Sequence, residues 1–114
     1  GLEGLTRAMA LDLKGTGIGP DGSTIDAEGY LWNAQWDGWR LARYAPDGRL
    51  DRVVPLPVQK PTSCMFGGPD LRTLYVTSAV WDLTPEQLRD QPQAGGLFAL
   101  DVGIGGVPEP RFAG

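Results

Sequence analysis

Short runs of alternating hydrophobic and polar residues, separated by turns rich in glycine and proline, fill most of the chain. Alternation with a period of two predicts β-strands that bury one face. The expected strands form two groups: 23–27, 31–35, 39–44 and 50–56, then 63–67, 74–79 and 96–101. The second group repeats the first after ~40 residues. This pattern predicts an all-β chain of short antiparallel strands.

One segment, 80–95, interrupts the second group between its second and third strands. Within it, Thr84, Pro85 and Gln87 have the spacing of a helix start. Thr84 would cap the helix, Pro85 would occupy the first helical position, and Gln87 would complete a capping box. We therefore predict a short helix inside this insertion.

The two ends of the chain carry weaker patterns. In residues 1–19 we expect a strand at 10–13, followed by a glycine-rich linker. Glu3 is expected to be an exposed surface residue, because Glu is seldom buried. At the other end, a final short strand is expected near 109–112.

Four short antiparallel strands repeating every ~40–45 residues are typical of β-propeller blades. The sequence predicts a partial β-propeller over its whole length. Residues 1–19 would end a preceding blade, 20–57 would form one blade, and 58–114 would form the last blade with its insertion at 80–95. Blades bury their faces against neighbours, and rings close with about four to eight blades. We expect a fragment of about two to two and a half blades, completed by a longer parent chain or, alternatively, by other copies.

Composition excludes several classes of function. The chain has 10 Lys and Arg against 14 Asp and Glu, a net charge of −4, and no basic stripe, which argues against nucleic acid and membrane partners. It has no histidine, which excludes a Ser-His-Asp triad or a His-liganded zinc within these residues. The single Cys64 cannot form an internal disulfide, which fits a reducing, cytoplasmic compartment. We expect it to be a buried, inert thiol.

Asp21, in a Pro-Asp-Gly sequence before the first strand, is the candidate for chemistry. Alternate connections of a four-strand meander lie at the same end, so Asp21 should share an end with the turn at 36–39, with 61–63 and with 80–95. The innermost strand of a blade starts beside the central channel, so Asp21 would face its mouth. From local sequence alone, it is a turn residue whose side chain bonds its own backbone.

Four motifs carry a family resemblance: GPDGSTIDAEGYLW at 19–32, TSCMFGG at 62–68, LYVT at 74–77 and QPQAGG at 91–96. In this order they resemble the family of senescence marker protein (regucalcin), gluconolactonases and related sugar lactonases. The resemblance runs from about Asp12 to the end and covers what looks like the C-terminal third of such a protein. It implies a six-bladed β-propeller with one divalent metal in its central channel.

The resemblance also implies that Asp21 is a metal ligand and the general base of sugar-lactone hydrolysis. Ca²⁺ is the expected ion, with Zn²⁺ or Mn²⁺ as alternatives. Calcium takes six to eight oxygens, of which one aspartate supplies one or two. The family's other ligands, a Glu and an Asn, and its substrate-contacting Arg and Asn have no counterpart here. This chain alone is therefore expected to be inactive. The alternatives are a non-enzymatic binding or scaffold propeller, or an esterase or phosphoesterase of the same family.

The tryptophans divide into two sets. Trp32 alternates correctly for packing between blades, because aromatic side chains dominate buried area. Trp36 and Trp81 fall at or near turns on the channel face. They either pack between blades or form a wall for a sugar ring, as the matching stretches do in the family.

Three further polar residues are interpreted as structural. Asp26 and Glu28 lie beyond the far end of the first strand and are expected to be solvated turn charges. Asn33, where the family usually has a small apolar residue, is expected to be a hydrogen-bonded amide on a blade face.

Overall fold

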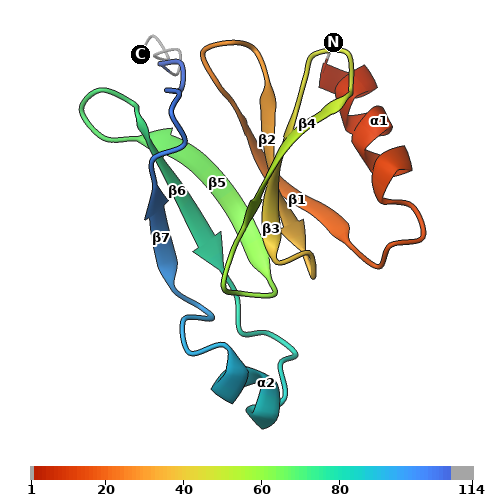
Figure 1. Cartoon of the computed structure of the whole chain (residues 1–114), viewed down its shortest axis with the longest axis vertical. Coiled ribbons are helices and arrows are strands. Elements are labelled where there is room, and N and C mark those ends of the chain that lie inside the picture. The colour runs from red at the N-terminus through yellow and green to blue at the C-terminus, as the bar shows by residue number, and fades with distance from the viewer. Residues whose placement is uncertain (1, 109–114) are drawn as a thin grey trace, which may run out of the picture.

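The computed structural model describes residues 2–108, which form two helices and seven strands in two antiparallel sheets (Figure 1). The helices are α1 (Leu2–Leu13) and α2 (Pro85–Asp90). The strands are β1 (Gly19–Ile25), β2 (Leu31–Trp36), β3 (Arg40–Tyr44), β4 (Leu50–Pro55), β5 (Pro61–Gly67), β6 (Thr73–Ser78) and β7 (Leu97–Leu100).

Each sheet is a meander. The first has the order β1-β2-β3-β4 and the second β5-β6-β7, with every neighbouring pair antiparallel. β1 and β2 pack against β5, so the inner strands of the two sheets lie together. The predicted repeat and its strands are confirmed to within a few residues at each end. The strand expected near 109–112 lies outside the described residues. Two packed antiparallel meanders are consistent with part of a β-propeller.

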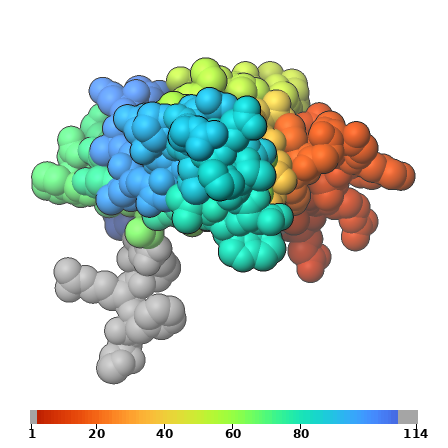
Figure 2. All heavy atoms as spheres, turned by 90° about the horizontal axis from the view of Figure 1, so that it is seen from below, coloured from red at the N-terminus to blue at the C-terminus, as the bar shows by residue number. Residues whose placement is uncertain are grey.

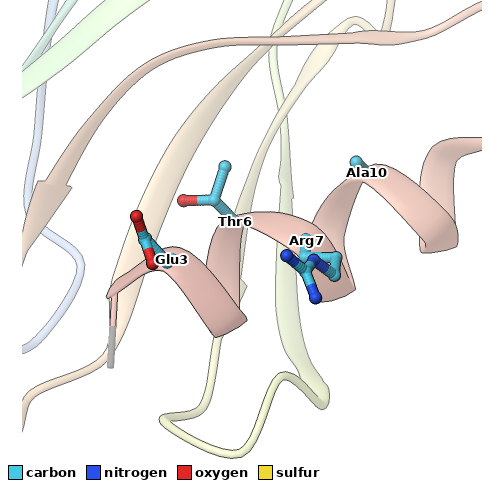
Figure 3. A pocket seen from close by; sticks show the side chains of 4 residues that line it. All are labelled: Glu3, Thr6, Arg7 and Ala10. Atoms are coloured by element: carbon cyan, nitrogen blue, oxygen red, sulfur yellow. The ribbon is translucent and has the colours of Figure 1, made fainter.

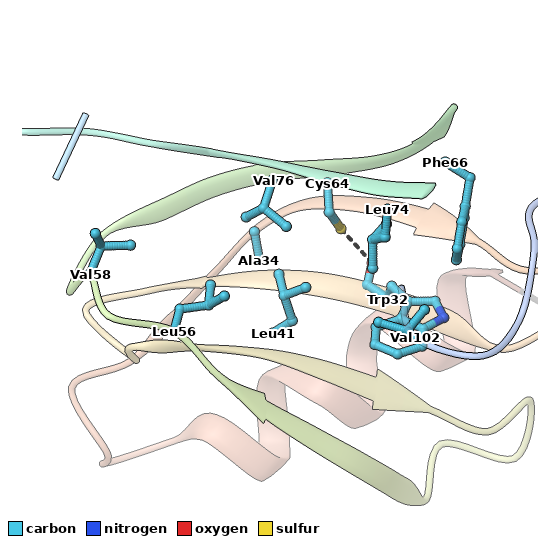
Figure 4. Close-up of a cluster of buried hydrophobic side chains, with 10 residues drawn as sticks. All are labelled: Trp32, Ala34, Leu41, Leu56, Val58, Cys64, Phe66, Leu74, Val76 and Val102. Atoms are coloured by element: carbon cyan, nitrogen blue, oxygen red, sulfur yellow. Dashed lines mark hydrogen bonds between the residues drawn. The ribbon is translucent and has the colours of Figure 1, made fainter. Parts of the chain in front are cut away.

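The main core fills the space between the two sheets (Figure 4). Trp32 from β2 is fully buried and meets Phe66 from β5 edge to face, with ring centroids 6.3 Å apart and planes at 83°. Its other buried members are Ala34, Leu41, Leu56, Val58, Cys64, Leu74, Val76 and Val102. The prediction that Trp32 packs between the repeats is confirmed.

The strand expected at 10–13 is wrong, because this stretch belongs to helix α1. Leu5, Met9 and Leu13 recur at the spacing of four residues that places side chains on one helical face. These side chains form a second core with β2 and β3 of the first sheet. Glu3 is exposed on this helix, as predicted.

Helix α2 begins as the sequence predicts. The Thr84 hydroxyl accepts a hydrogen bond from the Gln87 amide at 3.1 Å, and the Thr84 amide donates to the Gln87 side chain at 2.8 Å. These two bonds are a complete capping box. Within residues 2–108, neither helix has the length and apolar character needed to cross a membrane.

Candidate functional site

One end of the two sheets gathers the segments that the meander topology predicts. Gly19 pairs with Trp36, and the Trp39 amide donates to the Gln59 carbonyl at 3.4 Å. The Ala79 amide donates to the Lys60 carbonyl at 2.9 Å, which fixes the start of the insertion beside the start of β5. This end, which we call the α2 end, lies at the bottom of Figure 1 and faces the reader in Figure 2.

Asp21 lies within β1 rather than on a turn, so that part of the prediction is wrong. Pro20 pairs with Gln35 and Ser23 with Asn33, which leaves Asp21 and its neighbour in a β-bulge between the two pairs. The side chain of Asp21 is exposed. Its carboxylate makes no hydrogen bond or ion pair with any of residues 2–108, and so does not bond its own backbone as an Asx turn would.

The bulge is held by Asn33 from the neighbouring strand β2. Its Nδ2 donates to the Asp21 carbonyl at 2.7 Å and to the Ser23 hydroxyl at 2.8 Å. The side chain is fully buried, and its Oδ1 has no hydrogen-bond partner among the described residues. The prediction of a hydrogen-bonded amide is therefore right for one end of the side chain and wrong for the other.

The residues that the structure describes do not by themselves complete a metal site. Asp21 offers an exposed carboxylate, the kind of hard oxygen ligand that divalent calcium takes. Within residues 2–108, however, no group of three or more His, Cys, Asp and Glu side chains could hold an ion. Asp21 fits the role of a single ligand, and most of a coordination shell would have to come from elsewhere.

Two tryptophans meet at the α2 end. The rings of Trp36 and Trp81 have centroids 6.4 Å apart and planes at 45°, and Trp81 is 71% exposed. Behind them, the Nζ of buried Lys60 lies 4.4 Å from the Trp36 centroid and 2.9 Å from the Asp37 carboxylate. The Lys60 ammonium thus lies against the Trp36 ring, and Trp36 contacts the exposed Trp81 indole, which presents an apolar surface at this end.

The prediction that Asp26 is a solvated turn charge is wrong. Asp26 is 1% exposed and accepts hydrogen bonds from Trp32 Nε1 at 2.8 Å and Arg43 Nε at 2.9 Å. Arg43 also pairs with Asp51 at 2.9 Å and with exposed Glu28 at 3.3 Å, so the prediction holds only for Glu28. Burial by itself would lower the pKa of Arg43, but these carboxylates outweigh it and raise that pKa. The register of β2 and β3 pairs Trp32 with Arg43 and so brings both donors to Asp26.

Cys64 is a buried thiol, as predicted. Its Sγ lies 3.5 Å from the Trp32 carbonyl oxygen, to which it donates. Burial raises the pKa of this thiol to about 12, so it stays protonated near neutral pH. A neutral, enclosed thiol has no nucleophilic role at this site.

A surface hollow of ~480 Å³ lies on α1 (Figure 3). It is lined by Glu3, Thr6, Arg7 and Ala10, all from this one helix. None of these residues belongs to the α2 end, so the hollow is separate from the candidate site.

The chain is similar to known proteins in sequence and in structure. The family model described as the SMP-30/Gluconolactonase/LRE-like region matches residues 4–80. A 6-deoxy-6-sulfogluconolactonase from Pseudomonas putida is 46% identical over 101 residues, which are 89% of this chain and 35% of that protein. A regucalcin from Gallus gallus is 50% identical over 97 residues, 83% of this chain and 32% of that one.

Among solved structures, a calcium-binding protein, regucalcin, from Agrobacterium tumefaciens aligns with a TM-score of 0.81 and 38% identity. The alignment covers 87% of this chain and 34% of that one. The chain thus spans about a third of the length of the relatives that it matches. Because the family model covers well over half of the sequence, this chain belongs to the SMP-30/gluconolactonase/LRE-like family.

Proposed function

We propose that this chain is part of a longer, metal-dependent sugar lactonase that hydrolyses the ester bond of an aldonolactone, and that Asp21 is its metal ligand and general base. The observation that carries the proposal is the exposed carboxylate of Asp21 at the α2 end, which has no partner among residues 2–108. Relatives named as a sulfogluconolactonase and as regucalcins support it. A six-bladed ring, with the other blades outside these residues, is part of the proposal.

The chemistry requires a water to add to the lactone carbonyl and the ring C–O bond to break. A divalent cation supplies a Lewis acid that polarises the carbonyl oxygen. In the proposed step, the Asp21 carboxylate accepts a proton from the attacking water. The same carboxyl group then returns the proton to the departing ring oxygen. Lactone and water thereby become the open-chain hydroxy acid, and Asp21 is regenerated as a carboxylate.

The proposed ion is Ca²⁺, with Zn²⁺ and Mn²⁺ as alternatives, because the solved relative from Agrobacterium tumefaciens is described as calcium-binding. Among residues 2–108, Asp21 is the one ligand that we propose for the ion, so this chain alone should bind the ion weakly and turn over no lactone. A reducing, cytoplasmic compartment is also proposed, since the single Cys64 is free and buried.

Trp36 and Trp81 are proposed as a wall for the sugar ring. The exposed Trp81 indole rests on Trp36, so its outer face is available to the apolar face of a sugar. Replacing Trp81 by Ala should raise KM about tenfold with little change in kcat. Leu97→Ala, at a residue that is 66% exposed on β7, is the control and should change neither constant. An unchanged KM for the Trp81 variant would remove this residue from the substrate site.

The test of the proposed function is lactone turnover by the full-length protein after chelation and re-addition of Ca²⁺, Zn²⁺ or Mn²⁺. Asp21→Asn should lower kcat by roughly 10²–10⁴-fold, the usual contribution of a general base. Asp47→Asn is the matched control, because Asp47 is an exposed turn carboxylate that accepts a hydrogen bond from the Arg49 amide. Unchanged turnover in the Asp21 variant would contradict the assignment. Aryl ester and phosphate ester substrates, assayed in parallel, distinguish a lactonase from an esterase or phosphoesterase.

A further inference from the structure

The direction in which the Asp21 side chain points depends on the conformation of its backbone. Its carboxylate has no partner among residues 2–108, so no side-chain contact orients it. Its backbone lies in the β-bulge between Pro20 and Ser23, where the regular pairing of β1 with β2 is broken. A bulge leaves main-chain groups without their ladder partners, and such groups need another source of hydrogen bonds.

Asn33 supplies the missing bond. Its Nδ2 donates to the Asp21 carbonyl at 2.7 Å, and the same nitrogen lies 3.5 Å from the Gly22 carbonyl. The second N–H of Nδ2 donates a hydrogen bond to the Ser23 hydroxyl oxygen, with 2.8 Å between the nitrogen and the oxygen. The amide therefore spans the whole bulge. Because Asn33 is fully buried, packing fixes its side chain and the donor stays in place.

The second sheet closes the bulge from the other side. A Cβ atom added at Gly22 would lie 2.9 Å from the Ser63 Cα and still closer to that residue's side chain. Only glycine permits β1 to approach β5 so closely at this point. The segment that carries Asp21 is thus held between Asn33 of its own sheet and Ser63 of the next.

Stability alone does not explain Asn33. Its Oδ1 is buried without a partner among the described residues, and an unsatisfied buried acceptor destabilises the fold. An apolar residue of similar size would avoid that cost. What such a residue would lack is the donor that reaches the Asp21 carbonyl.

We infer that Asn33 is a positioning residue, which fixes the β1 bulge and thereby aims the Asp21 carboxylate at the site. The role in metal binding rests on the proposed function, whereas the ordering of the bulge does not. Asn33 itself touches neither ion nor substrate in this account.

The test compares the full-length wild type with Asn33→Val. The first readout is the backbone order of Asp21 and Gly22 from ¹⁵N relaxation. It should fall from the rigid range, about 0.85, to below about 0.6 in the variant. Ser23→Ala is the control, because it removes one partner of Asn33 but keeps the bond to the Asp21 carbonyl. Its order parameters should match the wild type.

The second readout is Mn²⁺ affinity by calorimetry, where Asn33→Val should weaken binding about tenfold, the lower end of effects seen for residues behind metal ligands. The midpoint of urea unfolding is measured beside it, to establish that the Asn33→Val protein is folded. Unchanged order and unchanged affinity in a folded Asn33→Val protein would overturn the inference. If wild type binds no ion, the proposed function fails and the order parameters still decide the role of Asn33. Should the Val variant not fold, Asn33→Ala is measured in the same way.

Discussion

Asp26 Oδ2 and Arg43 Nη2 lie 2.8 Å apart, and the side chain of Asp26 is completely shielded from solvent. The pair lies beyond the end of β1 opposite to Asp21 and joins β3 to the turn after β1. The guanidinium also stacks on Tyr30, with 3.9 Å between Cζ and the ring centroid. Asp26 therefore organises the end of the first sheet opposite to the end where Asp21 lies.

Removing one partner of this buried pair should destabilise the fold strongly. Asp26→Ala leaves the Arg43 charge without its most buried partner and the Trp32 N–H without an acceptor. Breaking such a pair costs about 3–5 kcal/mol of unfolding free energy. Urea denaturation of Asp26→Ala, with exposed Asp70→Ala as the control, measures the difference. A loss below about 0.5 kcal/mol, the scale of ordinary surface changes, would show that the pair is not structural.

The coupling within the pair can be measured separately. A double-mutant cycle with Arg43→Met should show that the two changes are far from additive, because the residues are in direct contact. Additive effects would mean that Asp26 acts through Trp32 rather than Arg43.

Helix α1 should stabilise the first sheet through one face only. Met9 is 2% exposed in the second core, whereas Leu11 on the same helix is 67% exposed. Met9→Ala should cost about 2–5 kcal/mol of unfolding free energy. Leu11→Ala removes a side chain of similar size and should cost less than about 0.5 kcal/mol. Thermal or urea unfolding of both variants checks the difference, and equal losses would contradict the packing of α1 described above.

Because its thiol is buried, Cys64 should lower the free energy of unfolding at alkaline pH. Burial raises the pKa of Cys64 to about 12 from an ordinary 9.0, so above pH 9 the unfolded chain gives up a proton that the folded chain keeps. The stability that this group contributes is fully present below pH 9 and is lost as the pH rises towards 12, by up to about 1.4 kcal/mol per pH unit. In the Cys64→Ala variant, the free energy of unfolding should therefore fall less steeply between pH 9 and 11 than in the wild type. Burial also raises the pKa of Tyr44, which adds a slope of the same sign in both proteins. If the free energy of unfolding falls equally steeply with pH in the variant and in the wild type, Cys64 does not contribute to the alkaline loss of stability.

The repeat of strands was predictable because its signals are local. Alternating side chains and glycine-containing turns determine where strands start and stop, whatever they pack against. Local alternation at 10–13 was misleading, since the helical spacing of Leu5, Met9 and Leu13 extends over a longer stretch. The helix signal was present in the sequence, but only in a window of nine or so residues.

The end of the sheet at which Asp21 lies was predictable, but its local conformation was not. Topology alone puts Asp21 at the same end as Trp36 and Trp81. The bulge at Asp21 depends on how closely Gly22 can approach Ser63 of the other sheet, which no local pattern encodes. The burial of Asp26 likewise depends on tertiary packing, and a local pattern reads such a residue as an exposed turn charge.

The central claim, that Asp21 binds a divalent ion at the α2 end, has a direct crystallographic test. Crystals of the full-length protein are soaked in Mn²⁺, and anomalous difference maps are calculated for wild type and for Asp21→Asn. If Asp21 is the metal ligand, one strong peak is expected within coordination distance of its carboxylate, about 2.0–2.6 Å. That peak should be lost or much weaker in the variant. A strong peak elsewhere in the protein, with none at Asp21, would contradict the account.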